Sequence, residues 1–120
     1  MLLHRQPEFS VIDAPSILGL RPTGVELLPK ALRAAGLVEQ LKADYAGIVA
    51  PTSAYNYKRD DGTGLLNPQA IKDYTLKLAE AVSGELRKNK FPIVIGGDCS
   101  ILIGNILALR RLGRYGLFFI

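Results

Sequence analysis

The sequence has one cysteine, one histidine and no tryptophan among its 120 residues. A single cysteine excludes an internal disulfide, and a free thiol is typical of a protein kept in a reducing compartment. The only histidine, His4, falls in an expected N-terminal tail, so it leaves no imidazole for a cluster of metal ligands elsewhere. A disulfide-stapled domain and a histidine-rich metal site are therefore both excluded.

The chain also lacks an apolar run long enough to cross a bilayer. Residues 1–7 contain no apolar signal-peptide core, and the apolar run after Ser100 is interrupted by Gly104 and Asn105. The formal net charge is +4, but the basic residues are spread out instead of forming one block with interleaved aromatics. We therefore expect a cytoplasmic protein that binds neither a membrane nor nucleic acid.

What the chain does have is the balance of one globular domain, with 48% hydrophobic and 22% charged residues. Short β-branched runs alternate with segments of helical periodicity, which predicts an α/β fold. Asn67 and Pro68 predict the start of a long helix, with Asn67 as its cap. The expected strands cover residues 9–12, 45–50, 91–95 and 115–120. The expected helices cover residues 29–35, 37–42, 68 to about 90, and 100–112.

A long polar segment, residues 51–66, follows the second expected strand. Loops of this length in compact domains are often functional or mobile. Since it follows a strand of a parallel sheet, it could overhang the edge where the third strand also ends. The alternative is an ordered surface excursion with no role in ligand binding.

The motif Gly96-Gly97-Asp98-Cys99-Ser100 joins the third expected strand to the following helix, where open α/β sheets bind ligands. The glycines allow a tight turn, the carboxylate is expected to accept backbone N–H groups, and the serine is expected to cap the helix. The cysteine is either a reactive thiol at the helix N-terminus or a small buried hydrophobe, and we expect it to be packed beneath residues 55–64. A phosphate-cradling loop is a weaker alternative, because the full Gly-x-Gly-x-x-Gly pattern is absent.

At this motif the chain resembles the arginase and agmatinase (ureohydrolase) family, whose members carry Gly-Gly-Asp-His-Ser. Residues 24–37 are similar to the family's Gly-Val-Glu-x-Gly-Pro-x-x-Leu-Arg-x-x-Gly-Leu segment, with Leu28 where the family usually has glycine. Residues 114–120 look like the strand that precedes its metal-binding Asp-x-His-x-Asp motif. The likeness covers most of residues 9–120 in the same order and spacing.

The resemblance implies the N-terminal part of a three-layer αβα fold with a mainly parallel sheet, of which about four strands are present. In the complete fold it also implies two manganese ions and a bridging hydroxide that attacks the carbon of a small guanidino or amidine substrate. Cys99 stands at the position of the family's first metal ligand, where a thiolate suits zinc or copper(I) better than manganese. We expect residues 1–120 to be a partial domain that stops before Asp-x-His-x-Asp. On this reading it is a fragment of a hydrolase of C–N bonds that binds no manganese pair and is inactive alone.

Two other functions remain open: a non-catalytic interaction module, and a thiol- or phosphate-binding module at residues 96–100. The apolar strand expected at residues 115–120 would lack its usual neighbours in the family's sheet. It would then pair with residues 91–95 or with another chain, and we expect self-association.

Overall fold

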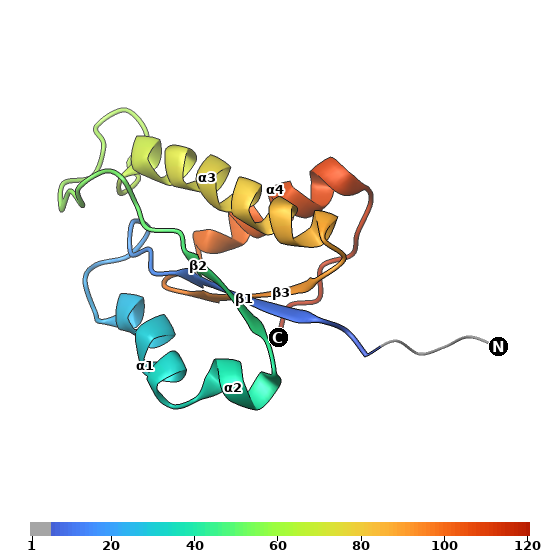
Figure 1. The fold of residues 1–120 in the computed structure, drawn as a ribbon. Coiled ribbons are helices and arrows are strands. Elements are labelled where there is room, and N and C mark those ends of the chain that lie inside the picture. Colours follow the sequence, from blue (N-terminus) through green and yellow to red (C-terminus); the bar gives the residue numbers. More distant parts are fainter. Residues whose placement is uncertain (1–5) are drawn as a thin grey trace.

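The structure is a computed structural model that describes residues 6–120, so His4 and its expected tail lie outside the described residues. Helices and strands alternate along the chain (Figure 1). The elements are β1 (Phe9–Ala14), a 3-10 turn (Val25–Leu27), α1 (Leu28–Ala34), α2 (Leu37–Leu41), β2 (Asp44–Ile48), α3 (Pro68–Arg87), β3 (Phe91–Gly96) and α4 (Ile101–Leu112).

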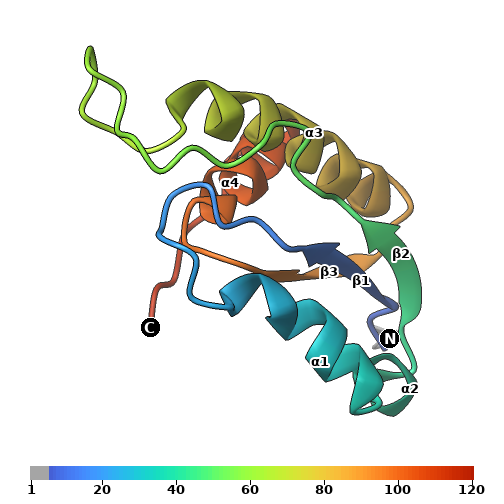
Figure 2. The same ribbon diagram turned by 90° about the vertical axis from the view of Figure 1, so that its left-hand side faces the viewer.

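The strands form one parallel sheet in the order β2-β1-β3. Helices α3 and α4 cover one face of this sheet, and α1 and α2 lie on the other face (Figures 1 and 2). This arrangement is a three-layer α/β fold. Because the strands are parallel, their carboxyl ends meet at one edge, and the loops that follow them gather there.

The hydrophobic core lies between the sheet and the α3–α4 layer. Its fully buried members come from β1 and the loops after the strands, and from the inner faces of the two helices: Ile12, Ala14, Leu18, Val49, Tyr74, Leu78, Ala79, Val82 and Ala108. Gly104 lets α4 approach α3 closely, since a Cβ there would lie 3.0 Å from the Leu78 side chain. The inner faces of α3 and α4 and one face of the sheet thereby form a single core.

Three of the four expected strands and all the expected helices are confirmed, with ends shifted by a few residues. The fourth expected strand, residues 115–120, is wrong: this segment forms neither helix nor strand, and Phe118, Phe119 and Ile120 are almost fully exposed. A strand needs a neighbour for its backbone N–H and C=O groups, and residues 6–114 place none beside it. The sheet of the described chain therefore has three strands.

Helix α4 is also less covered than its nearly continuous apolar sequence predicts. Ile103, Ile106 and Leu112 are exposed, and only Gly104 and Ala108 are fully buried. Among the helices of residues 6–120, none has the length and hydropathy needed to cross a membrane.

Candidate functional site

The turn between β3 and α4 packs directly on the chain that follows β1. Gly97 has a positive φ of 33°, and a Cβ on it would lie 2.1 Å from the carbonyl oxygen of Ser16. The next residue, Asp98, donates its backbone N–H to that same oxygen at 2.9 Å. Only glycine fits at position 97, because backbone of another loop occupies the space of a side chain.

The carboxylate of Asp98 joins these two loops. It is buried, and its Oδ2 accepts the backbone N–H of Gly19 at 2.6 Å. Its Oδ1 accepts the backbone N–H of Ser100 at 3.0 Å and also the Ser100 hydroxyl. Gly19 is close as well, since a Cβ on it would lie 3.1 Å from Asp98 Oδ2. The carboxylate thus holds the turn in place through charge-assisted hydrogen bonds.

The two expected side-chain caps are wrong. Ser100 precedes α4 with α-helical φ and ψ, its side chain makes no capping bond, and its hydroxyl donates to Asp98 instead. Asn67 precedes α3 with a positive φ of 47° and likewise makes no capping bond. A side-chain cap normally needs an extended backbone at this position, which neither residue has.

Asn67 instead joins the loop at residues 51–67 to the rest of the edge. Its side-chain oxygen accepts the N–H of Asn56 at 2.7 Å, and its amide donates to the carbonyl oxygen of Leu18 at 3.0 Å. The hydroxyl of Tyr55 donates to the carbonyl oxygen of Leu20 at 2.6 Å. The loop is therefore anchored to residues 18–20, which in turn contact Asp98.

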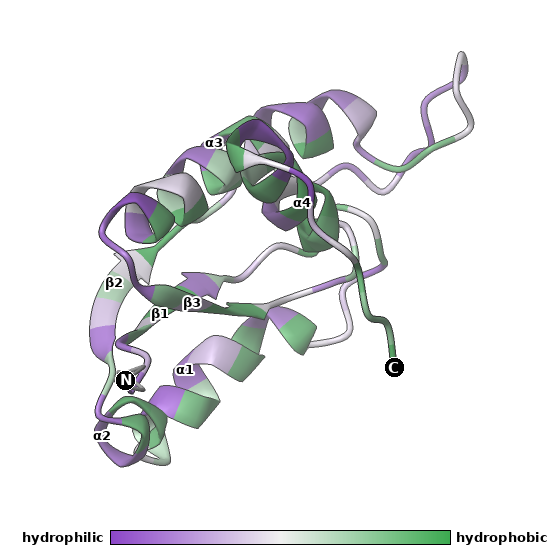
Figure 3. Ribbon diagram, turned by 90° about the vertical axis from the view of Figure 1, so that its right-hand side faces the viewer, coloured by the Kyte–Doolittle hydropathy of each residue, from purple (hydrophilic) through white to green (hydrophobic). Residues whose placement is uncertain are grey.

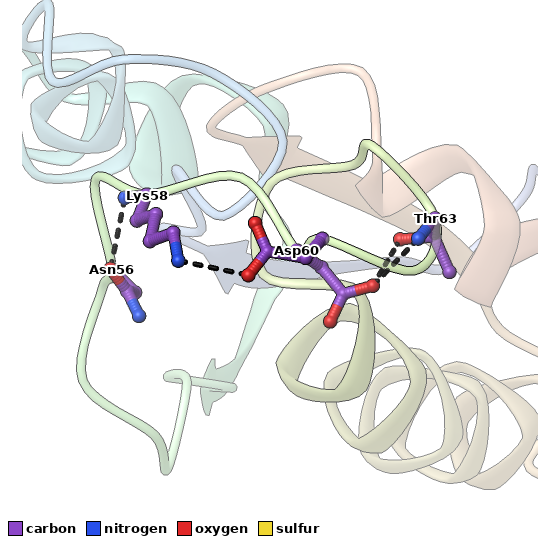
Figure 4. Close-up of polar contacts among 5 residues, drawn as sticks. Asn56, Lys58, Asp60 and Thr63 are labelled. Carbon is purple, nitrogen blue, oxygen red and sulfur yellow. Dashed lines mark hydrogen bonds and ion pairs between the residues drawn. The ribbon is translucent and has the colours of Figure 1, made fainter.

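The tip of this loop is ordered by its own hydrogen bonds (Figure 4). Lys58 donates its backbone N–H to Asn56 Oδ1 and its ammonium to Asp61 Oδ2, both at 2.9 Å. Asp60 accepts the N–H and the hydroxyl of Thr63, and these hydrogen bonds, the hydroxyl's first, lower the pKa of Asp60. The loop is thus an ordered excursion, and a hollow of about 440 Å³, lined mostly by polar residue types, lies between it and the start of α3.

The side chain of Cys99 is exposed at this edge, so the expected packing beneath residues 55–64 is wrong. Gly97 and Asp98 pack on the chain after β1. The loop at residues 51–67 is hydrogen-bonded to residues 18–20 and not to the turn that carries the thiol. Within residues 6–120, no three His, Cys, Asp or Glu side chains come close enough to share a metal ion. The described residues therefore do not fit the two-manganese centre that the resemblance implies.

A second polar cluster, on the α1 side of the sheet, has no counterpart in the sequence-based analysis. Asp13 is buried on β1, and its Oδ2 accepts Arg33 Nε at 2.7 Å and the Tyr45 hydroxyl at 3.1 Å. The Arg33 guanidinium also lies 4.6 Å from the centre of the Tyr45 ring. The hydrogen bond to Asp13 raises the pKa of Arg33, while partial burial and then that carboxylate raise the pKa of Tyr45. The sequence signal that could have revealed this cluster is Asp13, a charged residue within a largely apolar strand.

Comparison with known proteins shows similarity along nearly the whole chain, not only at the turn after β3. The profile of the Arginase family matches residues 8–118. The arginase of Staphylococcus aureus (strain COL) is 37% identical over 107 residues, which cover 84% of this chain and 35% of the relative. The arginase of Bacillus caldovelox is 32% identical over 107 residues, covering 85% of this chain and 36% of the relative.

The fold agrees with the sequence match. The native structure of the Bacillus caldovelox arginase superposes with a TM-score of 0.79 at 30% identity, over 89% of this chain and 38% of that chain. An arginase structure from Bacillus cereus superposes with a TM-score of 0.74 at 29% identity. The chain spans about a third of the length of the curated relatives it matches. With the family profile matched over nearly all of its length, the chain belongs to the arginase family.

Proposed function

We propose that residues 1–120 are a partial domain of an arginase-type hydrolase, which in its complete form cleaves C–N bonds of small guanidino or other linear amidine compounds. We further propose that this chain alone has no hydrolytic activity. The family match supports the first part, and the share of about a third of each relative's length supports the second. A cytoplasmic location is part of the proposal and rests on the single free thiol.

The proposal depends on one contrast at residues 96–100. The backbone of this turn is held by several hydrogen bonds, whereas the described residues provide few groups that could bind a metal ion there. The turn after β3 is fully held, with Asp98 accepting two backbone N–H groups and the Ser100 hydroxyl. In contrast, Cys99 is the only residue of the turn that stands at a family metal position, and the described residues supply no cluster around it. In the complete fold two manganese ions would supply hydroxide from bound water near neutral pH.

In that complete fold, the residues of this turn would position the backbone at the metal-ligand position, Cys99. Gly97 and Asp98 fix the backbone on either side of the ligand position, and Gly19 fixes Asp98 in turn. A thiol at that position is a softer ligand than the carboxylates and imidazoles that suit manganese. The turn is therefore a scaffold whose metal ligands have to come mostly from elsewhere.

Two measurements on the purified 120-residue chain test this proposal. We expect urea release from arginine and from agmatine, each with added Mn²⁺, to stay at background, and calorimetric titration to show no tight binding of two Mn²⁺ per chain. The Cys99→Ala variant is the matched control and should give the same two results. Turnover above background that is lost in Cys99→Ala would show that the chain is a complete catalyst.

We also propose, as a second function, a non-catalytic interaction module that self-associates. The specific observation in its favour is the exposed apolar segment of residues 115–120. Such a segment with no charge or proline is a template for pairing with another chain.

A further inference from the structure

One peptide group of the chain after β1 lies between two side chains that come from distant parts of the sequence. This group joins Leu18 to Gly19. Its carbonyl oxygen accepts the side-chain amide of Asn67 at 3.0 Å, and its N–H donates to Asp98 Oδ2 at 2.6 Å. Because a peptide group is planar and rigid, the two contacts fix one plane from both ends. Asn67 is therefore linked to Asp98 through a single rigid group.

This link is shielded from water. Leu18 is 2% exposed, Asp98 3% and Asn67 8%. Hydrogen bonds in such surroundings are stronger than in water, and they polarise one another along a chain. An amide that donates to the carbonyl oxygen makes the N–H of the same peptide group a better donor to the carboxylate. Asn67 thus strengthens the hydrogen bond between Gly19 and Asp98.

The carboxylate of Asp98 connects this link to the turn after β3. Its Oδ1 accepts the N–H and the hydroxyl of Ser100, and the backbone N–H of Asp98 donates to the Ser16 carbonyl oxygen at 2.9 Å. Cys99 lies between these two anchored residues, so its backbone position follows from theirs. All of these contacts lie where three loops meet at one end of the sheet (Figures 2 and 3). The thiol is exposed at that end.

Asn67 is itself held by the loop at residues 51–67. Its Oδ1 accepts the backbone N–H of Asn56 at 2.7 Å, and its amide also donates to the Asn56 carbonyl oxygen at 3.2 Å. The positive φ of Asn67, 47°, is a conformation that asparagine tolerates better than most residues. Its side chain makes three hydrogen bonds, and none of them caps the helix that it precedes. The side chain therefore aligns two loops with each other.

We propose that Asn67 is a positioning residue for the turn that carries Cys99. It acts through the peptide group of residues 18–19 and the Asp98 carboxylate, so the loop at residues 51–67 helps to set where the thiol lies. The inference deepens the proposed function and rests on it for the importance of position 99. If Asn67 only stabilised its own loop, its replacement would change the stability of the chain but not the geometry of the turn in the folded state.

Nuclear magnetic resonance of the 120-residue chain tests this proposal in the folded state. The Asn67→Asp variant keeps an oxygen for the loop and tolerates a positive φ, but its ionised carboxylate has no donor for the peptide group of residues 18–19. We expect the Gly19 amide proton to move upfield and to exchange with water about tenfold faster, because its hydrogen bond to the carboxylate is weakened. The amide resonances of Cys99 and Ser100 should shift as well.

The same substitution in an Asp98→Asn background shows whether the effect passes through the carboxylate. Asp98→Asn removes the charge and keeps the shape of the side chain, so the effect of Asn67→Asp on Cys99 and Ser100 should become smaller. Val82→Ala is the matched control. Val82 belongs to the core and lines a hollow at the start of β3, away from the loops, so its truncation should lower stability and leave all three amide resonances in place.

Three results would overturn the proposal. One is unchanged Cys99 and Ser100 resonances in a destabilised Asn67→Asp variant. Another is shifts of the same size in Val82→Ala, which would report general destabilisation. The third is an undiminished effect in the Asp98→Asn background; if that background does not fold, the single variants decide the question. No readout involves manganese or urea release, so a failure here would leave the proposed function standing, and turnover by the chain would leave the link from Asn67 standing.

Discussion

Gly97 makes the closest approach in the turn after β3, and its replacement tests the packing of this turn. We expect Gly97→Ala to lower the free energy of unfolding by about 3 kcal/mol, because the new methyl group would meet the Ser16 backbone and φ is positive. Urea unfolding followed by circular dichroism measures the change. Gly84→Ala is the control: Gly84 lies within α3 with open space around it, so the alanine should stabilise by about 0.5–1 kcal/mol. A loss below about 1 kcal/mol for Gly97→Ala would contradict the observed contact.

Single residues show where sequence-based inference stops. The order of glycines and polar residues at positions 96–100 predicts a tight turn at the sheet edge, and such a turn is present. Gly19, however, packs closely on Asp98, a residue 79 positions away in the chain, and a Cβ on Gly19 would lie 3.1 Å from the Asp98 carboxylate. Cys99 was expected to be buried and is exposed, because local composition does not tell which way a turn faces. Partners that come from distant loops are set by the tertiary fold.

At the scale of elements, Asn67 joins a loop to the start of α3, and two substitutions separate its backbone role from its side-chain role. Asn67→Gly keeps the positive φ and removes the bonds to Asn56 and Leu18, so we expect a loss of about 2 kcal/mol in unfolding free energy. Asn67→Ala should cost about 1 kcal/mol more, since alanine is strained at positive φ. Both values come from chemical denaturation.

Asn89 supplies the matched control for this pair of variants. It also has a positive φ, 57°, just beyond the end of α3. Asn89→Gly should therefore leave the unfolding free energy within about 0.5 kcal/mol of the parent chain. If Asn67→Gly proves equally neutral, the hydrogen bonds of Asn67 do not stabilise the loop.

The helices and the first three strands were predictable because each has its own periodicity and boundary signals. Helix α3, for example, repeats apolar residues at helical spacing over five turns and buries Tyr74, Leu78 and Val82 on that face. Residues 115–120 carry an equally strong strand pattern but form no strand. Strand formation depends on a neighbour, and the pattern of a segment contains no information about whether one is available.

At the scale of the whole molecule, the α3–α4 layer and the α1 layer pack on the sheet through different interactions. The α3–α4 layer is held by an apolar core, whereas α1 is tied to β1 by the ion pair of Asp13 with Arg33. A buried carboxylate loses more when its partner is removed than an exposed one does, because the charge is left without solvation. The two layers therefore differ in what stabilises them. Each layer also contacts a tyrosine with a raised pKa, Tyr74 on the α3 side and Tyr45 on the α1 side, so the stability of both depends on pH.

Alkaline pH should destabilise the folded chain through Tyr74 and Tyr45. Burial, and after it the charge of Asp98, raises the pKa of Tyr74 well above that of a free tyrosine, and partial burial raises that of Tyr45. The unfolded chain releases these protons near pH 10, whereas the folded chain keeps them. The contribution is therefore complete below about pH 9, and Tyr74 alone should lower the unfolding free energy by about 1.4 kcal/mol per pH unit above pH 10.

Urea unfolding between pH 7 and pH 11.5 measures this slope, and Tyr74→Phe identifies its source. The variant loses the hydrogen bond from the Tyr74 hydroxyl to the Val49 carbonyl oxygen, so we expect it to be about 1–2 kcal/mol less stable at pH 7. It should also have a shallower alkaline limb, because the phenylalanine has no proton to release from the unfolded chain. Tyr57→Phe, on the exposed loop, should change neither value. An alkaline slope that is as steep in Tyr74→Phe as in the parent chain would assign the pH dependence to other groups and remove Tyr74 as its cause.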